Sequence, residues 1–406
     1  MRILHTADWH LGKRLHKYDL RDDHDSFFSW MCNTIREKEV DVLLVSGDVF
    51  DQANPSNEAR STYYQLLSRL MQVGCQVVIT GGNHDSPSEL NAPQEILRYL
   101  KIHVLGKMPQ NPEEVLIPLF RKNDEQAAAV VSAIPYLRDS EIRKMEAGES
   151  QLDRYEAIRN GIRRVFDQAA ELCTGKYQRL PALAMGHLYA QGVQASESER
   201  EIQIGNLAGF DSALFHKHFS YYALGHIHRP QRVGKEGHIY YSGSPVSLSF
   251  SERDHQKRVI LLNLNGSTEI ESLPIPGQRK LLKVSGDLQG IASKLEKLEL
   301  EQSSLHALLE IELVEETHDP SKIIELESLL DGFNHPHAQI VKHRVRFLNK
   351  VSGSSKLFSP EQVLEDIQPI EVFEKRLEKE GLPEQSRDML MEAFREILEE
   401  INREEA

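Results

Sequence analysis

The chain has 406 residues, 40% of them hydrophobic, so it exceeds one ordinary domain and can fill more than one core. Its three cysteines, Cys32, Cys75 and Cys173, lie far apart, and no apolar run nears membrane-spanning length, which argues against a disulfide scaffold and a membrane protein. The net charge of −14 says little about nucleic acid, because residues 351–406 alone hold 15 acidic and 7 basic residues.

The first residues form an apolar run directly after Met1, without the features of a signal peptide. Reduced, widely spaced cysteines are what a cytoplasm permits, and each one is interpreted as a small buried hydrophobe. We therefore expect a soluble cytoplasmic protein.

Five apolar runs, at residues 2–6, 40–45, 77–79, 181–185 and 221–224, are each followed by polar side chains, usually just after a glycine. In chain order these polar residues are Asp8 and His10, then Asp48 and Asp51, then Asn83, His84 and Asp85, then His187, and finally His226 and His228. The carboxyl ends of strands in an open α/β sheet line a common crevice, so we expect these side chains to converge.

The donor types narrow the chemistry. Imidazole, carboxylate and carboxamide without cysteine suit octahedral binding of Mn²⁺, Fe²⁺ or Mg²⁺ better than a structural zinc site. Seven of these ten side chains, taken as ligands, are too many for one ion. Two ions that share one carboxylate would use them all, at the roughly 3.5–4 Å separation of two-metal phosphoesterases.

Each of these residues also has an ordinary interpretation. A single His at a strand end more often completes a hydrogen bond than binds a metal. Asp8 could cap a turn, and Asn83 could tolerate left-handed backbone in a loop. Independent caps have no reason to follow five separate strands, so the joint pattern favours the metal site.

Helices are predicted between these strands. Residues 19–39 carry Phe27, Phe28, Met31 and Ile35 at helical spacing, and Asn54-Pro55 is typical of a helix start. Residues 88–100 and 151–173 predict two more helices, the second with a stripe of Ile158, Ile162, Phe166 and Ala169. Strands without candidate ligands are predicted at residues 129–134, 238–241 and 259–264.

After residues 274–277 the pattern changes to a small α+β unit. It predicts strand 280–284, helix 288–300, strand 307–314, helix 321–330 and strand 339–347. The last strand places Lys342, Arg344 and Arg346 on one face. That face is either solvated or a surface that contacts phosphate groups.

The end of the chain follows a linker that we place at residues 350–358, rich in Ser and Gly. Beyond it we predict a helical segment, 359–406, whose final helix carries Leu390, Phe394, Ile397 and Ile401 four, three and four residues apart. Such a seam suits docking on a partner helix, and the alternative is packing on the chain's own body.

The five motifs resemble, in order, those of the calcineurin-like metallophosphoesterases. Residues 1–12 (MRILHTADWHLG), 47–51 (GDVFD) and 241–245 (YSGSP) sharpen this to a resemblance to the SbcD family, the nuclease subunits of bacterial SbcCD complexes. The resemblance implies a four-layer α/β/β/α sandwich of two mixed sheets over residues 1–275. An α+β capping domain at 278–349 and the helical tail would follow.

The resemblance also implies residue roles. One metal ion would be held by Asp8, His10, Asp48 and His228, and a second by Asp48, Asn83, His187 and His226. His84 would protonate or steer the scissile phosphate and leaving group, and Asp85 would support an imidazole. Archaeal and eukaryotic relatives commonly carry His where this chain has Asp51, so no role can be transferred to that position.

The implied activity is that of a DNA nuclease, namely a double-strand 3′→5′ exonuclease and single-strand endonuclease that processes hairpins and DNA ends. Two divalent ions, with Mn²⁺ first and Mg²⁺ or Fe²⁺ next, would serve as cofactors. The alternative is a phosphoesterase that acts on a non-DNA ester, but such an enzyme needs neither the α+β unit nor the tail.

The implied partners are DNA and an SbcC-like coiled-coil ATPase, in a heterotetramer of two nuclease and two ATPase subunits. The sequence contains no GxxxxGK[ST] loop, so any ATP dependence must come from that partner. The family forms a homodimer through helices that fall here near 55–73 and 88–100. It acts in the bacterial cytoplasm, at the nucleoid.

Overall fold

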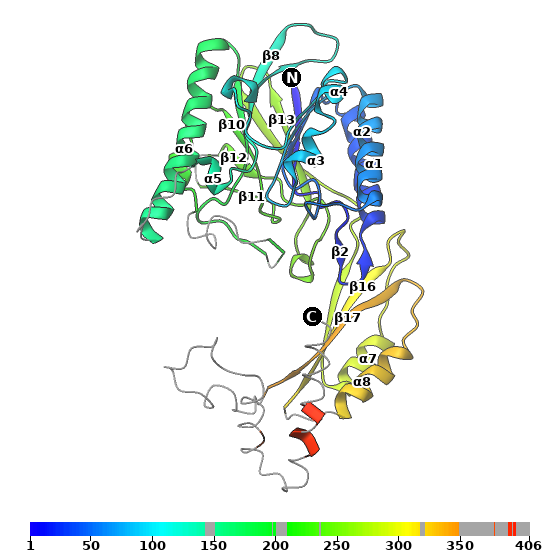
Figure 1. Ribbon diagram of the computed structural model, residues 1–406. Coiled ribbons are helices and arrows are strands. Elements are labelled where there is room, and N and C mark those ends of the chain that lie inside the picture. Colours follow the sequence, from blue (N-terminus) through cyan, green and yellow to red (C-terminus); the bar gives the residue numbers. More distant parts are fainter. Residues whose placement is uncertain are drawn as a thin grey trace. The chain divides into compact units, whose positions relative to one another are not determined.

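The computed structural model (Figure 1) describes residues 1–142, 151–196, 198–199, 209–234, 237–316, 321–348, 377, 389–391 and 393–394. The chain divides into two compact units. Unit 1 comprises Met1–Lys283, Glu299–Glu310 and Asn334–Lys342, and unit 2 comprises Val284–Leu298, Ile311–Phe333 and His343–Ala406. Among the described residues, no helix has both the length and the apolar character that crossing a membrane requires.

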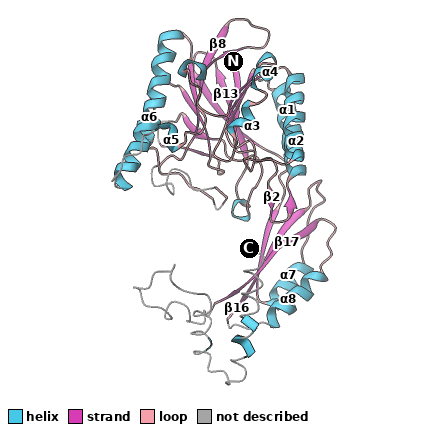
Figure 2. Ribbon diagram, viewed as in Figure 1, coloured by secondary structure: helices cyan, strands magenta, loops and turns pink. Residues whose placement is uncertain are grey.

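Unit 1 contains two six-stranded mixed sheets (Figure 2). The first has the order β14-β13-β1-β4-β5-β6. Its strands are β1 (Arg2–Thr6), β4 (Val42–Ser46), β5 (Gln76–Thr80), β6 (Ile102–Leu105), β13 (Arg258–Leu264) and β14 (Thr268–Pro274). Strands β1, β4, β5 and β6 run parallel, whereas β13 and β14 are antiparallel to their neighbours.

The second sheet has the order β11-β12-β10-β9-β8-β7. Its strands are β7 (Leu116–Phe120), β8 (Ala127–Ala133), β9 (Ala182–His187), β10 (Tyr221–Gly225), β11 (Gln231–Arg232) and β12 (Ile239–Tyr241). Here β8, β9, β10 and β12 are parallel, and the two edge strands are antiparallel. The sequence predicted each candidate-ligand strand to within two residues at either end.

Helices cover the outer faces of this pair of sheets (Figure 1). Helices α1 (Arg21–Glu37) and α2 (Asn57–Val73) lie on one side, and α6 (Gln151–Lys176) lies on the other. Shorter elements are α3 (Pro87–Asn91), α4 (Gln94–Tyr99), α5 (Asp139–Ile142), the hairpin β2 (Arg14–Leu15) and β3 (Tyr18–Asp19), and the 3₁₀ turns η1 (Pro112–Val115), η2 (Ser212–Leu214) and η3 (Phe250–Glu252). The predicted four-layer α/β/β/α class is confirmed.

Alternation along the central strands separates two cores. Val42 and Leu44 of β4 belong to the core cluster that includes Leu183 of the opposite sheet, whereas Leu43 and Val45 pack in the cluster that contains Phe27 of α1. Successive side chains of a strand point to opposite faces, so a buried central strand supplies both layers. The apolar runs in the sequence are long because both of their faces are covered.

Two helix predictions were wrong in detail. Helix α2 begins at Asn57, because the side chain of Ser56, and not of Asn54, accepts a hydrogen bond from the Ala59 N–H at 3.2 Å. The single helix expected over residues 88–100 is two helices, α3 and α4. Pro93 lies between them and has no N–H to continue the helical hydrogen bonds. The predicted stripe of α6, from Ile158 to Ala169, is buried as expected.

A buried ion pair fixes the segment that follows β14. The Arg279 guanidinium donates from Nε to Asp23 Oδ1 and from Nη2 to Asp23 Oδ2, both at 2.8 Å. Its third contact is Nη1 to the His306 carbonyl at 2.6 Å, and the guanidinium lies 4.7 Å from the Tyr18 ring centroid. This bidentate geometry holds the segment against α1.

A three-stranded sheet of order β15-β16-β17 follows. Its strands are β15 (Leu281–Gly286), β16 (Ala307–Glu315) and β17 (Ala338–Phe347), and its helices are α7 (Leu288–Glu296) and α8 (Ser321–Asp331). The strand–helix–strand–helix–strand order predicted from the sequence is confirmed.

Candidate metal centre

The carboxyl ends of five parallel strands bring the predicted polar residues together. Asp8 and His10 follow β1, Asp48 follows β4, Asn83 and His84 follow β5, His187 ends β9, and His226 and His228 follow β10. All of these side chains are buried except Asn83, which is half-buried. Both sheets therefore contribute side chains to one small volume.

Glycines make this close approach possible. A Cβ at Gly47 would lie 2.2 Å from His187 Nδ1, and a Cβ at Gly82 would lie 2.1 Å from Asp48 Oδ1. Neither distance is sterically allowed, so only glycine fits where the two strand ends meet.

The backbone at the site is strained. Asp8 (φ 52°), His10 (φ 49°), Asp48 (φ 49°) and His226 (φ 103°) all have positive φ, which residues with a side chain rarely adopt. Each such conformation costs roughly 1–3 kcal/mol and persists only where the surroundings enforce it. Four of the predicted site residues thus face the cluster through unusual backbone geometry.

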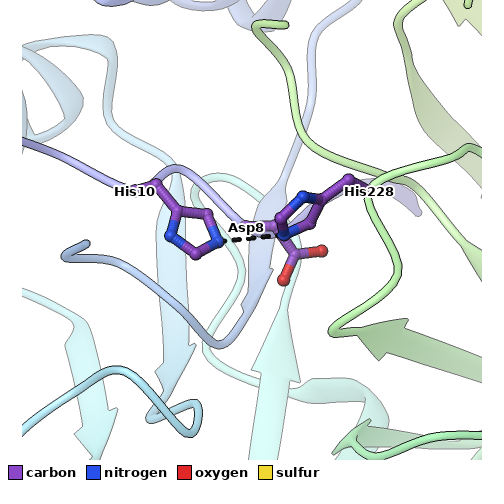
Figure 3. A group of neighbouring side chains, drawn as sticks. All are labelled: Asp8, His10 and His228. Atoms are coloured by element: carbon purple, nitrogen blue, oxygen red, sulfur yellow. Dashed lines mark hydrogen bonds between the residues drawn. The ribbon is translucent and has the colours of Figure 1, made fainter. Parts of the chain in front are cut away.

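Figure 3 shows the first group, Asp8, His10 and His228, whose ligand atoms lie within 4.8 Å of one another. The two imidazoles face each other, with His10 Nε2 3.1 Å from His228 Nε2. Asp8 Oδ2 is buried and has no hydrogen-bond partner in the described part of the chain. Two ring nitrogens and a bare carboxylate oxygen therefore point at a common space.

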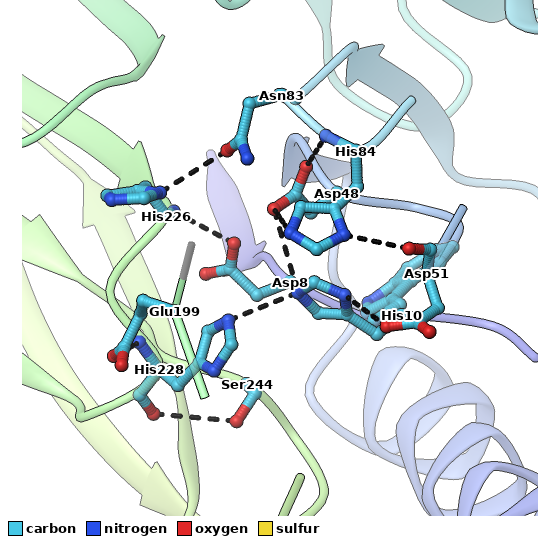
Figure 4. A network of polar contacts seen from close by, with 12 residues as sticks. Asp8, His10, Asp48, Asp51, Asn83, His84, Glu199, His226, His228 and Ser244 are labelled. Carbon is cyan, nitrogen blue, oxygen red and sulfur yellow. Dashed lines mark hydrogen bonds and ion pairs between the residues drawn. The ribbon is translucent and has the colours of Figure 1, made fainter. Parts of the chain in front are cut away.

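Asp48 lies at the centre of the second group (Figure 4). Its Oδ2 atom is 3.4 Å from His187 Nε2, 3.6 Å from His10 Nε2 and 4.0 Å from His84 Nε2. Asn83 Oδ1 lies 2.9 Å from His187 Nε2 and 3.3 Å from His226 Nδ1. Asp48 is therefore in contact with histidines from both predicted ligand sets.

Hydrogen bonds from its backbone and from its ring position His84. Its backbone N–H donates to Asp48 Oδ1 at 2.9 Å, and its Nδ1–H donates to the Asp51 carbonyl at 2.8 Å. The Nε2 atom is thereby directed at the cluster. This geometry would also let His84 join His10 and Asp48 as a metal ligand, so ligand and proton donor are both open to it.

The contacts of Asp85 differ from the predicted support of an imidazole. Its carboxylate accepts hydrogen bonds from the backbone N–H groups of Gly82 (2.8 Å), Phe50 (2.9 Å) and Val49 (3.1 Å), and none of these partners is an imidazole. Burial raises its pKa to about 6. Asp85 therefore ties the loop after β5 to the loop after β4.

Burial and charge act against each other at the acidic residues. Burial raises the pKa of Asp8 to about 7. Burial would also raise the pKa of Asp48, but the nearby His187 imidazole lowers it well below its usual value. Burial would lower the pKa of His187, but Asp48 raises it to about 9. A proton on His187 thus compensates the Asp48 carboxylate, as a cation would.

The donor set fits a divalent metal. Asp8 Oδ2, Asp48 Oδ2 and His226 Nε2 are buried without a hydrogen-bond partner among the described residues. Such atoms are costly unless something binds them. His187 donates its Nδ1–H to the Ser46 carbonyl at 3.0 Å, so its Nε2 is directed at the oxygens of Asn83 and Asp48. Nitrogen and oxygen donors without sulfur suit Mn²⁺, Fe²⁺ or Mg²⁺.

Several residues around the cluster were missed by the sequence reasoning. Glu252 and Lys257, both fully buried, form an ion pair near His228, and Ser198 Oγ lies 2.7 Å from His228 Nδ1. None of them follows an apolar strand, so the pattern that found the other residues could not find these.

The YSGSP stretch positions the His228 loop. The Ser244 N–H donates to the His228 carbonyl at 3.2 Å. A Cβ at Gly243 would lie 2.7 Å from that same carbonyl oxygen, so glycine is needed for this close approach. The Ser244 hydroxyl also donates to this carbonyl, at 3.5 Å, so the stretch acts on the cluster through His228.

Three residues predicted to contact DNA belong to β17. On β17, Lys342 Nζ is 2.9 Å from Glu310 Oε1, and Arg344 Nη2 is 2.8 Å from Glu312 Oε1. Arg346 Nε is 3.7 Å from the same Glu312 oxygen. Carboxylates of β16 therefore offset this basic face, and its contact with DNA stays a prediction.

In the tail, Leu390 is 42% exposed and Phe394 is half-buried. Ile397 and Ile401 lie outside the described residues, as do the predicted linker at 350–358 and most of the predicted helical segment at 359–406. Docking of a partner on this seam also stays a prediction.

The two sheets, with histidines and carboxylates at their strand ends, define a phosphoesterase of the calcineurin-like class. The family model described as calcineurin-like phosphoesterase matches residues 1–230. A second model, described as the type 5 capsule protein repressor C-terminal domain, matches residues 278–381. The first match together with the candidate ligand groups makes the chain a hydrolase that binds divalent metal.

Curated relatives narrow the class further. The SbcD subunit of the nuclease SbcCD from Escherichia coli (strain K12) is 32% identical over 97% of this chain and 97% of its own length. The proteins of the same name from Rhodobacter capsulatus and Bacillus subtilis are 35% and 30% identical, over 74% and 66% of this chain and 76% and 68% of their own lengths. The chain belongs to the SbcD family of SbcCD nucleases.

Proposed function

We propose that the chain is a DNA nuclease that hydrolyses phosphodiester bonds with two divalent ions, Mn²⁺ being the preferred metal. The observation that carries the proposal is the contact of Asp48 Oδ2 with both His10 and His187, at 3.6 and 3.4 Å. A carboxylate between two histidine sets can serve two ions at once. Bound ions of this kind polarise a phosphate and lower the pKa of water at neutral pH.

The residues divide between the two ions as the family resemblance implies. Asp8, His10 and His228 would hold one ion, and Asn83, His187 and His226 the other, with Asp48 between them. The close approach of His10 and His228 supports the first set, and the contacts of Asn83 Oδ1 with His187 and His226 support the second.

His84 would act on the leaving group. Its Nδ1–H is engaged by the Asp51 carbonyl, so only Nε2 is directed at the cluster. An imidazole held in this way can present a proton to the departing oxygen or hold a phosphate oxygen in place. Its 4.0 Å separation from Asp48 Oδ2 keeps it beside the ligands.

The proposed substrate is DNA, with double-strand 3′→5′ exonuclease, single-strand endonuclease and hairpin- and end-processing activity. The matched relatives are named as nucleases, and the Escherichia coli protein matches 97% of this chain, which disfavours a phosphoesterase for non-DNA esters. Those relatives are also named as parts of an SbcCD complex, which supports an SbcC-like coiled-coil ATPase as partner.

We propose a homodimer through α2 and the segment of α3 and α4, which are the helices expected near 55–73 and 88–100, within a heterotetramer of two nuclease and two ATPase subunits. Large apolar side chains are exposed on two of these helices: Tyr64 and Met71 on α2, and Ile96 (70% exposed) and Tyr99 (90% exposed) on α4. Exposed apolar groups of this size favour a protein contact.

The test is metal-dependent cleavage. Linear duplex, hairpin and single-stranded circular DNA are incubated with Mn²⁺, with and without the coiled-coil ATPase and ATP, beside bis(p-nitrophenyl) phosphate as a non-DNA ester. We expect hairpin and single-strand cleavage by the chain with Mn²⁺ alone, and processive duplex degradation only with the ATPase. Hydrolysis of the small ester without cleavage of any DNA would refute the proposal.

A further inference from the structure

In the group of Asp8, His10 and His228, each histidine has a carboxylate and a lysine on its Nδ1 side. Behind His10, Asp51 Oδ1 lies 3.3 Å from the ring Nδ1, and Lys13 Nζ lies 3.1 Å from the same oxygen. The lysine, the carboxylate and the imidazole thus lie in a row in space. His10 Nε2 is at the far end of this row, near His228 and Asp48.

A second set of the same composition stands behind His228. The ring Nδ1 is 2.7 Å from Ser198 Oγ and 3.5 Å from Glu252 Oε1, and the serine hydroxyl donates to that same carboxylate oxygen. Lys257 pairs with the other oxygen of Glu252 and also donates to Ser244 Oγ at 2.8 Å. Both Glu252 and Lys257 are fully buried.

A neutral imidazole has one N–H and one bare nitrogen, and an acceptor at Nδ1 fixes which is which. Ser198 Oγ lies within hydrogen-bond distance of His228 Nδ1, whereas Asp51 Oδ1 makes an ion-pair contact, and no hydrogen bond, with His10 Nδ1. With a proton on Nδ1 of both rings, the two Nε2 lone pairs face each other at 3.1 Å. That arrangement is unfavourable for two neutral rings unless a cation lies nearby, and both rings present Nε2 to the space beside Asp8 Oδ2.

We propose that Asp51 and Glu252 are positioning residues, each paired with a lysine, that fix His10 and His228 for one metal ion. Asp51 would attract the Nδ1 proton of His10 directly, and Glu252 would act on that of His228 through the Ser198 hydroxyl, which makes each Nε2 a better donor to the ion. The lysine compensates the charge of the carboxylate and holds it in place. This inference rests on the proposed function, because it concerns one of the two proposed ions.

The two pairs differ in burial, which predicts different sensitivities. Lys13 and Asp51 are 25% and 12% exposed, whereas neither Lys257 nor Glu252 is exposed. A buried ion pair seldom stabilises a protein more than apolar residues of the same size would. Stability alone therefore does not explain why this chain has Glu252 and Lys257 at these positions. Loss of Glu252 should therefore act on the ion more than loss of Asp51 does.

The experiment measures Mn²⁺ binding to the full-length chain by calorimetry, with no dependence on nuclease activity. Asp51→Asn and Glu252→Gln keep size and remove the charge, and Asp25→Asn and Glu37→Gln, both exposed on α1, are the matched controls. We expect the affinity of one of the two ions to fall about 10–100-fold in the first two variants and the other ion to bind as in the wild type.

Glu252→Gln leaves Lys257 buried without its charged partner and can fail to fold, so Glu252→Gln/Lys257→Met is measured beside it. The double variant should fold, as its far-ultraviolet circular dichroism will show, and lose affinity for the same single ion. If Asp51→Asn and the double variant both bind Mn²⁺ as the wild type does, this inference is wrong, while the proposed function is unaffected. A wild-type chain that binds no Mn²⁺ would instead overturn the proposed function.

Discussion

Replacement of Asp48 by Asn tests the proposed bridging role most directly. The amide keeps an oxygen that can accept the His84 N–H, which lies 2.9 Å from Asp48 Oδ1 in the wild type, so the loop after β5 should keep its conformation. What the substitution removes is the negative charge near His10 and His187.

The size of the effect follows from that charge. A unit charge and a divalent ion 4 Å apart attract each other by about 8 kcal/mol at an effective dielectric constant of 20, so even half of this attraction is about three orders of magnitude in affinity. Both proposed ions would lose this attraction. Asp48→Asn should therefore bind neither Mn²⁺ ion at micromolar concentrations and should have no measurable nuclease activity.

The assay pairs calorimetric Mn²⁺ titration with cleavage of end-labelled single-stranded DNA, and Asp25→Asn serves as the control. Wild-type binding of both ions by Asp48→Asn would refute the bridging role. Activity above a few per cent of wild type at saturating Mn²⁺ would refute it as well.

Four further outcomes are expected. His84→Gln should keep both ions and DNA affinity while turnover falls about 10²–10⁴-fold, and a loss of one ion would make His84 a ligand. Arg279→Ala should lower the free energy of unfolding in urea by roughly 3–5 kcal/mol, because it leaves a buried carboxylate unpaired, and a change below about 1 kcal/mol would contradict this. Tyr99→Glu should convert the dimer to monomer in sedimentation velocity, and an intact dimer would exclude α4 from the interface. Deletion of residues 356–406 should abolish ATP-stimulated duplex degradation and leave Mn²⁺-dependent single-strand cleavage unchanged. The double variant Phe394→Asp/Ile397→Asp should have the same effect as the deletion. Loss of all cleavage would instead mean that the tail belongs to the chain's own core.

The sequence predicted which polar side chains lie together in the fold, because strand ends carry a local signal. An apolar run followed by glycine and a polar residue, as at Gly47-Asp48 or Gly186-His187, marks both the strand and its ligand. Features that neighbouring residues determine, such as the order of the strands and helices, can therefore be predicted from the sequence pattern.

Residues that act across long sequence separations could not be predicted in this way. Glu252 lies 24 positions from His228 in a segment without strand character, and Lys257 resembles any surface lysine in the sequence. Their burial is decided by packing of segments that are distant in the chain. The role of Asp85 was mispredicted for the same reason, since its nearest donors include the backbone of Val49 and Phe50.

The positive φ angles of Asp8, His10, Asp48 and His226 have a consequence for engineering. At roughly 1–3 kcal/mol each, their combined cost is comparable to the net stability of a typical domain, which is about 5–15 kcal/mol. Glycine at any of these positions would relieve the backbone strain, but it would remove a side chain of the cluster. A thermostability screen that does not require metal binding would therefore enrich inactive variants. Selection for a more thermostable nuclease needs Mn²⁺ binding as a second criterion.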